Sequence, residues 1–146
     1  MNVTTKIAFS LFLFAILLSM VFSAVYLFRP TFMPYHAAAV GKNWAELDVR
    51  LQALILGLMR VASGSWLTAS VATLFLLFIP FRKGATWSRW AILLVGLASA
   101  VPTTYGTLIV KLRTPGSPPW YAPAVSIVLL VAGFILSFGG RRKEGA

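Results

Sequence analysis

The sequence predicts an all-α fold, an integral membrane four-helix bundle with an additional amphipathic helical segment on its outer side. Three observations predict it. Hydrophobic residues make up 59% of the 146 residues, and charged residues only 11%. Four apolar runs of about 20 residues recur along the chain, the length that an α-helix needs to cross a hydrocarbon core of roughly 30 Å. The runs cover residues 7–28, 60–79, 90–110 and 120–138. Because they use most of the chain, we expect one transmembrane domain over residues 1–146.

The first connection between the runs contains a break and a further helical pattern. Prolines within residues 30–34 end the first run. Asn43 followed three residues later by Glu46 is the pattern of an N-cap with a capping box. Residues 44–58 then repeat apolar side chains at three- and four-residue steps, which predicts an amphipathic helix. This helix either lies on the membrane surface or continues into the second run. We favour the continuous helix, because nothing between the N-cap and Pro80 must break it.

The other connections are short. Residues 80–88 contain Lys83-Gly84 and predict a tight turn between antiparallel helices. Residues 114–119 contain three prolines and predict a helix-free connection. Pro102 lies inside the third run, where it frees a backbone carbonyl and is expected to bend the helix.

The positions of Lys and Arg predict the orientation in a membrane. Four spans place both termini and the connection 80–88 on one face. That face carries seven cations: Lys6, Arg82, Lys83, Arg89, Arg141, Arg142 and Lys143. The opposite face carries five: Arg29, Lys42, Arg50, Lys111 and Arg113. The positive-inside rule therefore predicts that both termini are cytoplasmic. The first run stays apolar through Phe28, longer than a signal peptide core, so we expect an uncleaved helix.

Composition excludes several classes of function. The net charge of +10 resides in connections and at the ends of the runs, where it meets lipid headgroups, and no basic stripe with interleaved aromatics predicts nucleic-acid binding. The chain has no cysteine, so we expect no thiol chemistry and no Cys-ligated metal. The apolar runs contain no Asp, Glu or His, which disfavours an ion-driven transporter, acid–base catalysis and a carboxylate-bound metal. We expect no catalytic residue, no metal and no cofactor.

Six residues are candidates for binding a small ligand in the outer half of the bundle. Counted from the cytoplasmic ends, the Ser/Thr-rich parts of the second and third runs lie at the same depth, about 22 Å up. Arg60 lies at the outer edge of this level, and His36 lies just outside the first run. The candidates are Arg60, Ser63, Thr103, Tyr105, Thr107 and His36. The alternative is structural: Ser, Thr and Gly commonly join membrane helices, and Arg60 can extend its side chain to the interface.

Two pairs of small residues indicate close helix contacts. Gly96 with Ala100 and Gly133 with Ser137 each have the small-xxx-small spacing that lets helix backbones approach. The spacing does not decide between contacts within the chain and contacts with another chain.

Three stretches resemble short four-span bacterial membrane proteins of unassigned role. They are Met33-Pro34-Tyr35-His36, the helix start Trp44-Ala45-Glu46-Leu47-Asp48, and Arg50-Leu51-Gln52-Ala53-Leu54. The size and layout of the chain are also similar to the DoxX-like group of small four-helix bundles. The resemblance implies a bacterial inner-membrane setting and a four-helix fold, and it transfers no functional residue.

These observations favour a non-enzymatic inner-membrane protein that acts as an accessory or stabilising subunit. Its expected partners are the lipid bilayer and either a larger membrane complex or further copies of itself. The alternative is a binder or carrier of a small hydrophobic or amphiphilic ligand, such as a lipid or a quinone, held in the outer half of the bundle.

Overall fold

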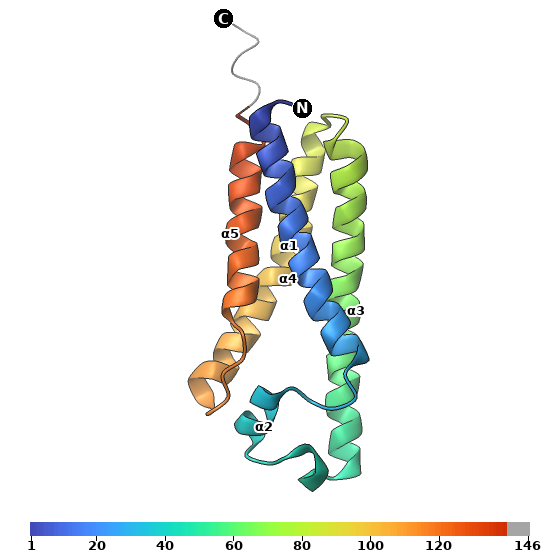
Figure 1. The fold of residues 1–146 in the computed structure, drawn as a ribbon, viewed down its shortest axis with the longest axis vertical. Coiled ribbons are helices and arrows are strands. Elements are labelled where there is room, and N and C mark those ends of the chain that lie inside the picture. The colour runs from blue at the N-terminus through green and yellow to red at the C-terminus, as the bar shows by residue number, and fades with distance from the viewer. Residues whose placement is uncertain (140–146) are drawn as a thin grey trace, which may run out of the picture.

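The computed structural model describes residues 1–139, and its regular structure over this range is entirely helical (Figure 1). The elements are α1 (Val3–Phe28), α2 (Pro34–Val40), a 3₁₀ turn η1 (Trp44–Glu46), α3 (Val49–Leu76), a π-helical turn η2 (Leu77–Phe81), α4 (Thr86–Arg113) and α5 (Tyr121–Leu136). The all-α prediction is therefore confirmed. The basic residues 141–143, which entered the orientation prediction, lie outside the described residues.

The four long helices form a bundle in which neighbours in space are not always neighbours in sequence. Helix α1 packs against α3 and α5, and α4 packs against the same two helices. The N-terminus and the end of α5 lie at one end of the bundle, and α2 lies at the other (Figure 1). We call these the terminal end and the cap end. Toward the cap end, α4 diverges from α3 in Figure 1, and Pro102 lies inside α4 without ending the helix.

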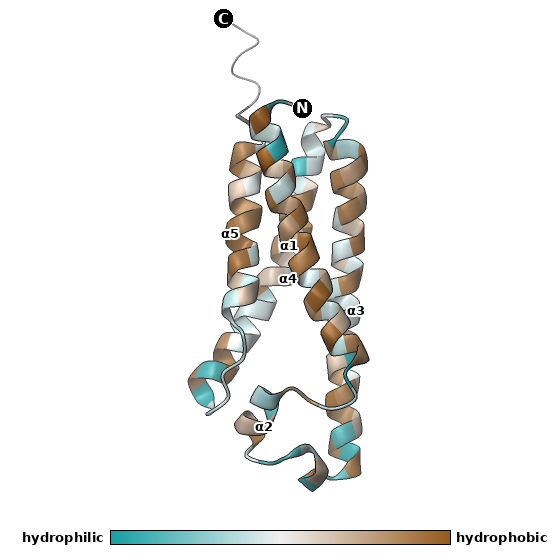
Figure 2. Cartoon of the chain, viewed as in Figure 1, coloured by the Kyte–Doolittle hydropathy of each residue, from teal (hydrophilic) through white to brown (hydrophobic). Residues whose placement is uncertain are grey.

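Within residues 1–139, three helices are long and apolar enough to cross a membrane, judged by length and composition: α1, α3 together with η2 (Val49–Phe81), and α4. The chain is therefore a multi-pass membrane protein. Apolar residues cover most of the four long helices, and hydrophilic residues gather toward the two ends (Figure 2). Helix α5 is apolar but shorter than the predicted run 120–138. Its 16 residues rise about 24 Å in total.

The segment 44–58 does not form one helix, which corrects part of the prediction. The capping box forms, since the Asn43 amide donates to Glu46 Oε2 at 2.9 Å, but it caps only the turn η1. Leu47 is extended and buried, and Asp48 caps α3 by accepting a hydrogen bond from the Arg50 amide at 2.8 Å. From Val49 onward the helix continues through the second apolar run, as predicted.

The turn between α3 and α4 forms where it was predicted, but the helix before it passes through Pro80. Pro80 has no N–H to donate, and the chain widens into the π-helical turn η2 at this position. The turn then closes at Gly84, whose φ of 80° lies in the left-handed region that favours glycine. The connection 114–119 contains no helix, as predicted.

The core lies toward the terminal end of the bundle. It contains the buried side chains Ala8, Phe12, Ala15, Ile16, Leu77, Phe81, Ile92 and Leu130. Both predicted glycine contacts are made within the chain. A Cβ on Gly96 would lie 2.6 Å from Leu130 Cδ1, and a Cβ on Gly133 would lie 3.0 Å from the Phe12 ring. These two glycines therefore let α5 approach α4 and α1 closely.

Candidate functional site: a cavity inside the bundle

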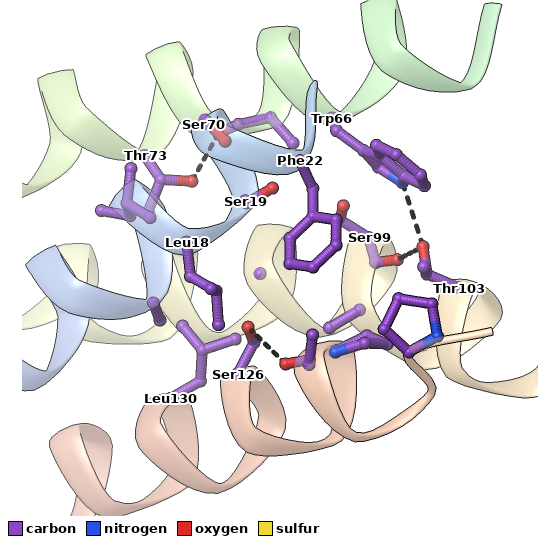
Figure 3. A pocket seen from close by; sticks show the side chains of 18 of the residues that line it. Leu18, Ser19, Phe22, Trp66, Ser70, Thr73, Ser99, Thr103, Ser126 and Leu130 are labelled. Atoms are coloured by element: carbon purple, nitrogen blue, oxygen red, sulfur yellow. Dashed lines mark hydrogen bonds between the residues drawn. The ribbon is translucent and has the colours of Figure 1, made fainter. Parts of the chain in front are cut away.

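The long helices surround a cavity of about 90 Å³ that extends from the middle of the bundle toward its cap end. Every long helix contributes side chains at helical spacing. These include Ser19, Phe22 and Tyr26 of α1, Trp66, Ser70 and Thr73 of α3, Ser99, Thr103 and Thr107 of α4, and Ala122, Ser126 and Leu130 of α5. Figure 3 shows side chains from all four helices around one shared space. None of the described residues that line the cavity is charged.

Most hydroxyls in the wall are occupied by hydrogen bonds. Thr73 donates to the Ala69 carbonyl at 2.6 Å, and Ser126 donates to the Ala122 carbonyl at 3.2 Å. Such bonds to the preceding turn make a Ser or Thr compatible with an apolar helix surface. They also leave these hydroxyls with less capacity to bind another molecule.

Ser70 is a buried hydroxyl of the wall that lacks such a bond. Its side chain is only 3% exposed, and its Oγ has no hydrogen-bond partner among the described residues. A buried hydroxyl without a partner costs about 1–3 kcal/mol. Ser70 is among the residues that line the cavity, so a rotation of its side chain toward this space would let the buried hydroxyl bind a molecule that enters.

A hydrogen bond between α3 and α4 forms part of the cavity wall. The Trp66 indole N–H donates to Thr103 Oγ1 at 3.0 Å, and Thr103 Oγ1 in turn donates to the Ser99 carbonyl at 2.8 Å (Figure 3). The Tyr26 ring packs edge-on against Trp66, with ring centroids 5.1 Å apart. The hydroxyl of Tyr26 is hydrogen-bonded to that of Tyr35 in α2. Aromatic side chains thus line the cap end of the cavity.

The two ends of the cavity differ in exposure. Toward the terminal end, its lining residues Ala15, Ile16 and Leu130 are buried and belong to the apolar core. Toward the cap end, the lining residues Tyr35, Thr107 and Pro119 are partly exposed. The cavity is therefore a pocket with a closed bottom formed by the core.

The structure brings only two of the six candidate residues to this cavity, Thr103 and Thr107. Tyr105 is 68% exposed on α4, and Arg60 is exposed on α3. Ser63 is buried in the contact with α1, where its carbonyl accepts a hydrogen bond from Ser23 Oγ at 2.7 Å. His36 lies in α2, and its neighbour Tyr35 lines the cavity instead.

The other cavity-lining residues of α1 and α3 follow a regular spacing in the sequence. Ser19, Phe22 and Tyr26 repeat at steps of three and four, and so do Trp66, Ser70 and Thr73. This is the period of one helix face. A search for faces on which polar and aromatic residues interrupt apolar runs would have found both stripes.

His36 belongs to a segment that covers the cap end. We call residues 29–48 the cap. Its buried residues Phe32 and Leu47 pack with Met59 of α3. The His36 ring is half-buried and lies edge-on to Tyr35, with ring centroids 4.4 Å apart, and its Nδ1 accepts a hydrogen bond from the Met33 amide at 3.3 Å. Burial lowers the pKa of His36 below its ordinary value.

This pKa shift predicts that acid loosens the cap. The folded pKa lies below the unfolded pKa, so the unfolded cap takes up the proton first and stability falls as the pH drops below about 6.5. Protonated Nδ1 also ceases to accept the Met33 amide hydrogen. We expect amides 34–40 to lose hydrogen-exchange protection, corrected for intrinsic rates, between neutral pH and pH about 5. His36→Phe keeps an aromatic ring and is expected to remove this pH dependence. An equal loss of protection in His36→Phe would contradict the assignment.

Among residues 1–139, no group of three or more His, Cys, Asp or Glu side chains is placed to hold a metal ion. Comparison of the chain with protein-family models, with curated proteins and with solved structures finds no match.

Proposed function

We propose that this protein binds one end of a small uncharged amphiphile in the cavity between its four long helices. The observation that carries the proposal is the Ser70 hydroxyl, which is buried in the cavity wall without a partner. A hydroxyl in this position gains a hydrogen bond when a ligand carbonyl or hydroxyl reaches it.

The composition of the wall supports an uncharged ligand. No charged side chain of the described residues lines the cavity, so an ion entering it would lose its hydration without compensation. Apolar and aromatic side chains with a few polar groups are typical of sites for small organic molecules.

The size of the cavity supports binding of one end only. A cavity of about 150 Å³ is known to hold benzene, and this one measures about 90 Å³. A chain end or a slender head group fits, and the rest of a larger molecule extends through the open side. Because the core closes the inner end of the cavity, its shape favours a binding site rather than a channel through the membrane.

The proposed setting is a bacterial inner membrane crossed four times, with α5 as the fourth span. A helix shorter than the hydrocarbon thickness can be accommodated by local thinning of the bilayer. The sequence tally of seven Lys and Arg against five, in which three of the seven are residues 141–143 outside the described range, favours a cytoplasmic location for the termini and an outward location for the cap. The chain is proposed to have no enzymatic activity.

Native mass spectrometry after purification in mild detergent at native expression level tests this function. We expect the protein to retain one neutral molecule per chain, whose mass identifies it. The subunit role that the sequence favours remains a prediction, and the same measurement tests it. A stoichiometric complex with a larger membrane protein, in which the chain carries no small molecule, would replace the ligand proposal with the subunit role.

A further inference from the structure

The outer surface of the bundle carries a groove between α3 and α4, directly outside the cavity. Among the four pairs of neighbouring long helices, α3 and α4 contact each other least. Gly64 and Ala72 of α3 and Ala98 of α4 line the groove, and a Cβ built on Gly64 would meet no atom within 4 Å. Pro102 also lines it and cannot donate to the Ala98 carbonyl one turn earlier. The groove thus combines open space with a backbone carbonyl that lacks its usual helical donor.

The groove and the cavity share a wall. Four residues line both spaces: Trp66 and Ala69 of α3, and Ser99 and Thr103 of α4. Two of the four have small side chains, so they add little to the thickness of the wall. Trp66 is the large one, and its indole N–H reaches across the seam to Thr103 Oγ1 at 3.0 Å.

We propose that the ligand enters the cavity sideways from the bilayer, through a portal between α3 and α4 that is latched by the Trp66–Thr103 hydrogen bond. The inference rests on the proposed function and adds the source of the ligand. The ligand is a slender, uncharged, membrane-dissolved molecule whose hydroxyl or carbonyl group passes from the groove to Ser70. In this arrangement the partly exposed cap end, lined by Tyr35, is not the route of entry.

Because the chain has no cysteine, Ser70→Cys places a single thiol in the cavity wall. The protein is reconstituted in lipid bilayers, and the rate at which butyl methanethiosulfonate labels this thiol is measured. The quaternary-ammonium analogue of the reagent tests entry from water, since its charge keeps it out of an apolar route. We expect the neutral reagent to label the thiol and the charged reagent to leave it unlabelled.

Thr103→Val in the Ser70→Cys background keeps the shape of the side chain and removes the acceptor for Trp66. We expect labelling by the neutral reagent to become about fivefold faster, the effect of losing one hydrogen bond that holds the portal closed. Thr104→Val is the matched control, because the Thr104 hydroxyl donates to the Ala100 carbonyl of its own helix and is not part of the cavity wall. We expect Thr104→Val to leave the rate unchanged, and Tyr35→Ala, which alters the cap end, to accelerate labelling less than Thr103→Val does.

Two results would overturn the portal: labelling by the charged reagent at the rate of the neutral one, or an acceleration by Thr103→Val no greater than that by Tyr35→Ala. The portal and the binding function fail in different ways. If the protein purifies with a neutral molecule that protects the Ser70→Cys thiol while Tyr35→Ala accelerates labelling at least as much as Thr103→Val does, the binding function is supported and the portal is wrong. If no molecule is retained and no added amphiphile protects the thiol, the binding function itself is wrong, and the portal falls with it.

Discussion

Phe12→Ala is expected to lower the free energy of unfolding by about 2 kcal/mol, the largest stability loss that we predict for a single side chain. Phe12 is 0% exposed, packs edge-on against Phe81 with ring centroids 5.6 Å apart, and lies against Gly133. It thereby joins α1 to η2 and α5. Lipid is as apolar as the core, so the transfer contribution familiar from soluble proteins largely disappears. The cavity contribution remains, at about 24 cal/mol for each Å³ of a void on the order of 100 Å³.

Phe14→Ala is the matched control for this prediction. Phe14 lies on the same helix but is 58% exposed, so its ring contacts the surroundings of the bundle rather than its core. Reversible unfolding in mixed micelles with increasing SDS measures both variants. We expect the control to differ from the parent protein by less than about 0.5 kcal/mol. Equal losses in the two variants would contradict the position of the core.

Local signals in the sequence were sufficient for many element boundaries. The end of α1 at Phe28 follows from Pro30, and the turn at Gly84 follows from a residue that tolerates positive φ. The length of an apolar run is likewise a local property, and it predicted the long helices. The start of α3 could not be predicted from local signals alone. Leu47 is buried against Phe32 of the cap and Met59 of α3, and this tertiary contact, together with the Asp48 cap, takes the chain out of the helix that its spacing predicted.

The position of the candidate site was only partly predictable, because it depends on how each helix is rotated about its axis. Three residues advance a helix by about 300°, so Arg60 and Ser63 differ in direction by about 60°. This difference leaves Arg60 exposed while Ser63 contacts α1. The depth of a residue in the bundle depends on its distance along the helix and not on how the helix is rotated. Comparing depths therefore predicted the contact between the second and third apolar runs. Thr103, from the Ser/Thr-rich part of the third run, accepts a hydrogen bond from Trp66 in the Ser/Thr-rich part of the second.

The cavity itself was not predictable from the residues that line it. Its space is bounded by side chains of all four long helices, of which Gly96 and Gly133 hold α5 close to α4 and α1. Each stripe of Ser, Thr and aromatic residues alone is equally compatible with helix packing. Only the arrangement of the four helices leaves the Ser70 hydroxyl buried without a partner.

Ala100→Leu is expected to reduce binding of the ligand by about tenfold to a hundredfold while the bundle stays folded. Ala100 is buried in α4 and lines the cavity, so an isobutyl group at this position grows into empty space. A ligand must then displace that group, at a cost of about 1–3 kcal/mol, which corresponds to the stated loss of affinity. Filling a void adds packing contacts, so we expect the unfolding free energy to stay equal or to rise.

Val101→Leu controls for the change in helix α4, because Val101 is the next residue, is exposed and does not line the cavity. The measurement is the fraction of protein that retains the neutral molecule in native mass spectrometry, followed by titration with that molecule once its mass identifies it. The control is expected to bind as the parent protein does. If Ala100→Leu also binds with unchanged affinity, the ligand does not occupy the cavity, and Ser70 cannot be its hydrogen-bond partner. A loss confined to Ala100→Leu places the bound end of the ligand between the four helices, next to Ser70, whose hydroxyl the fold leaves buried and without a partner among the described residues.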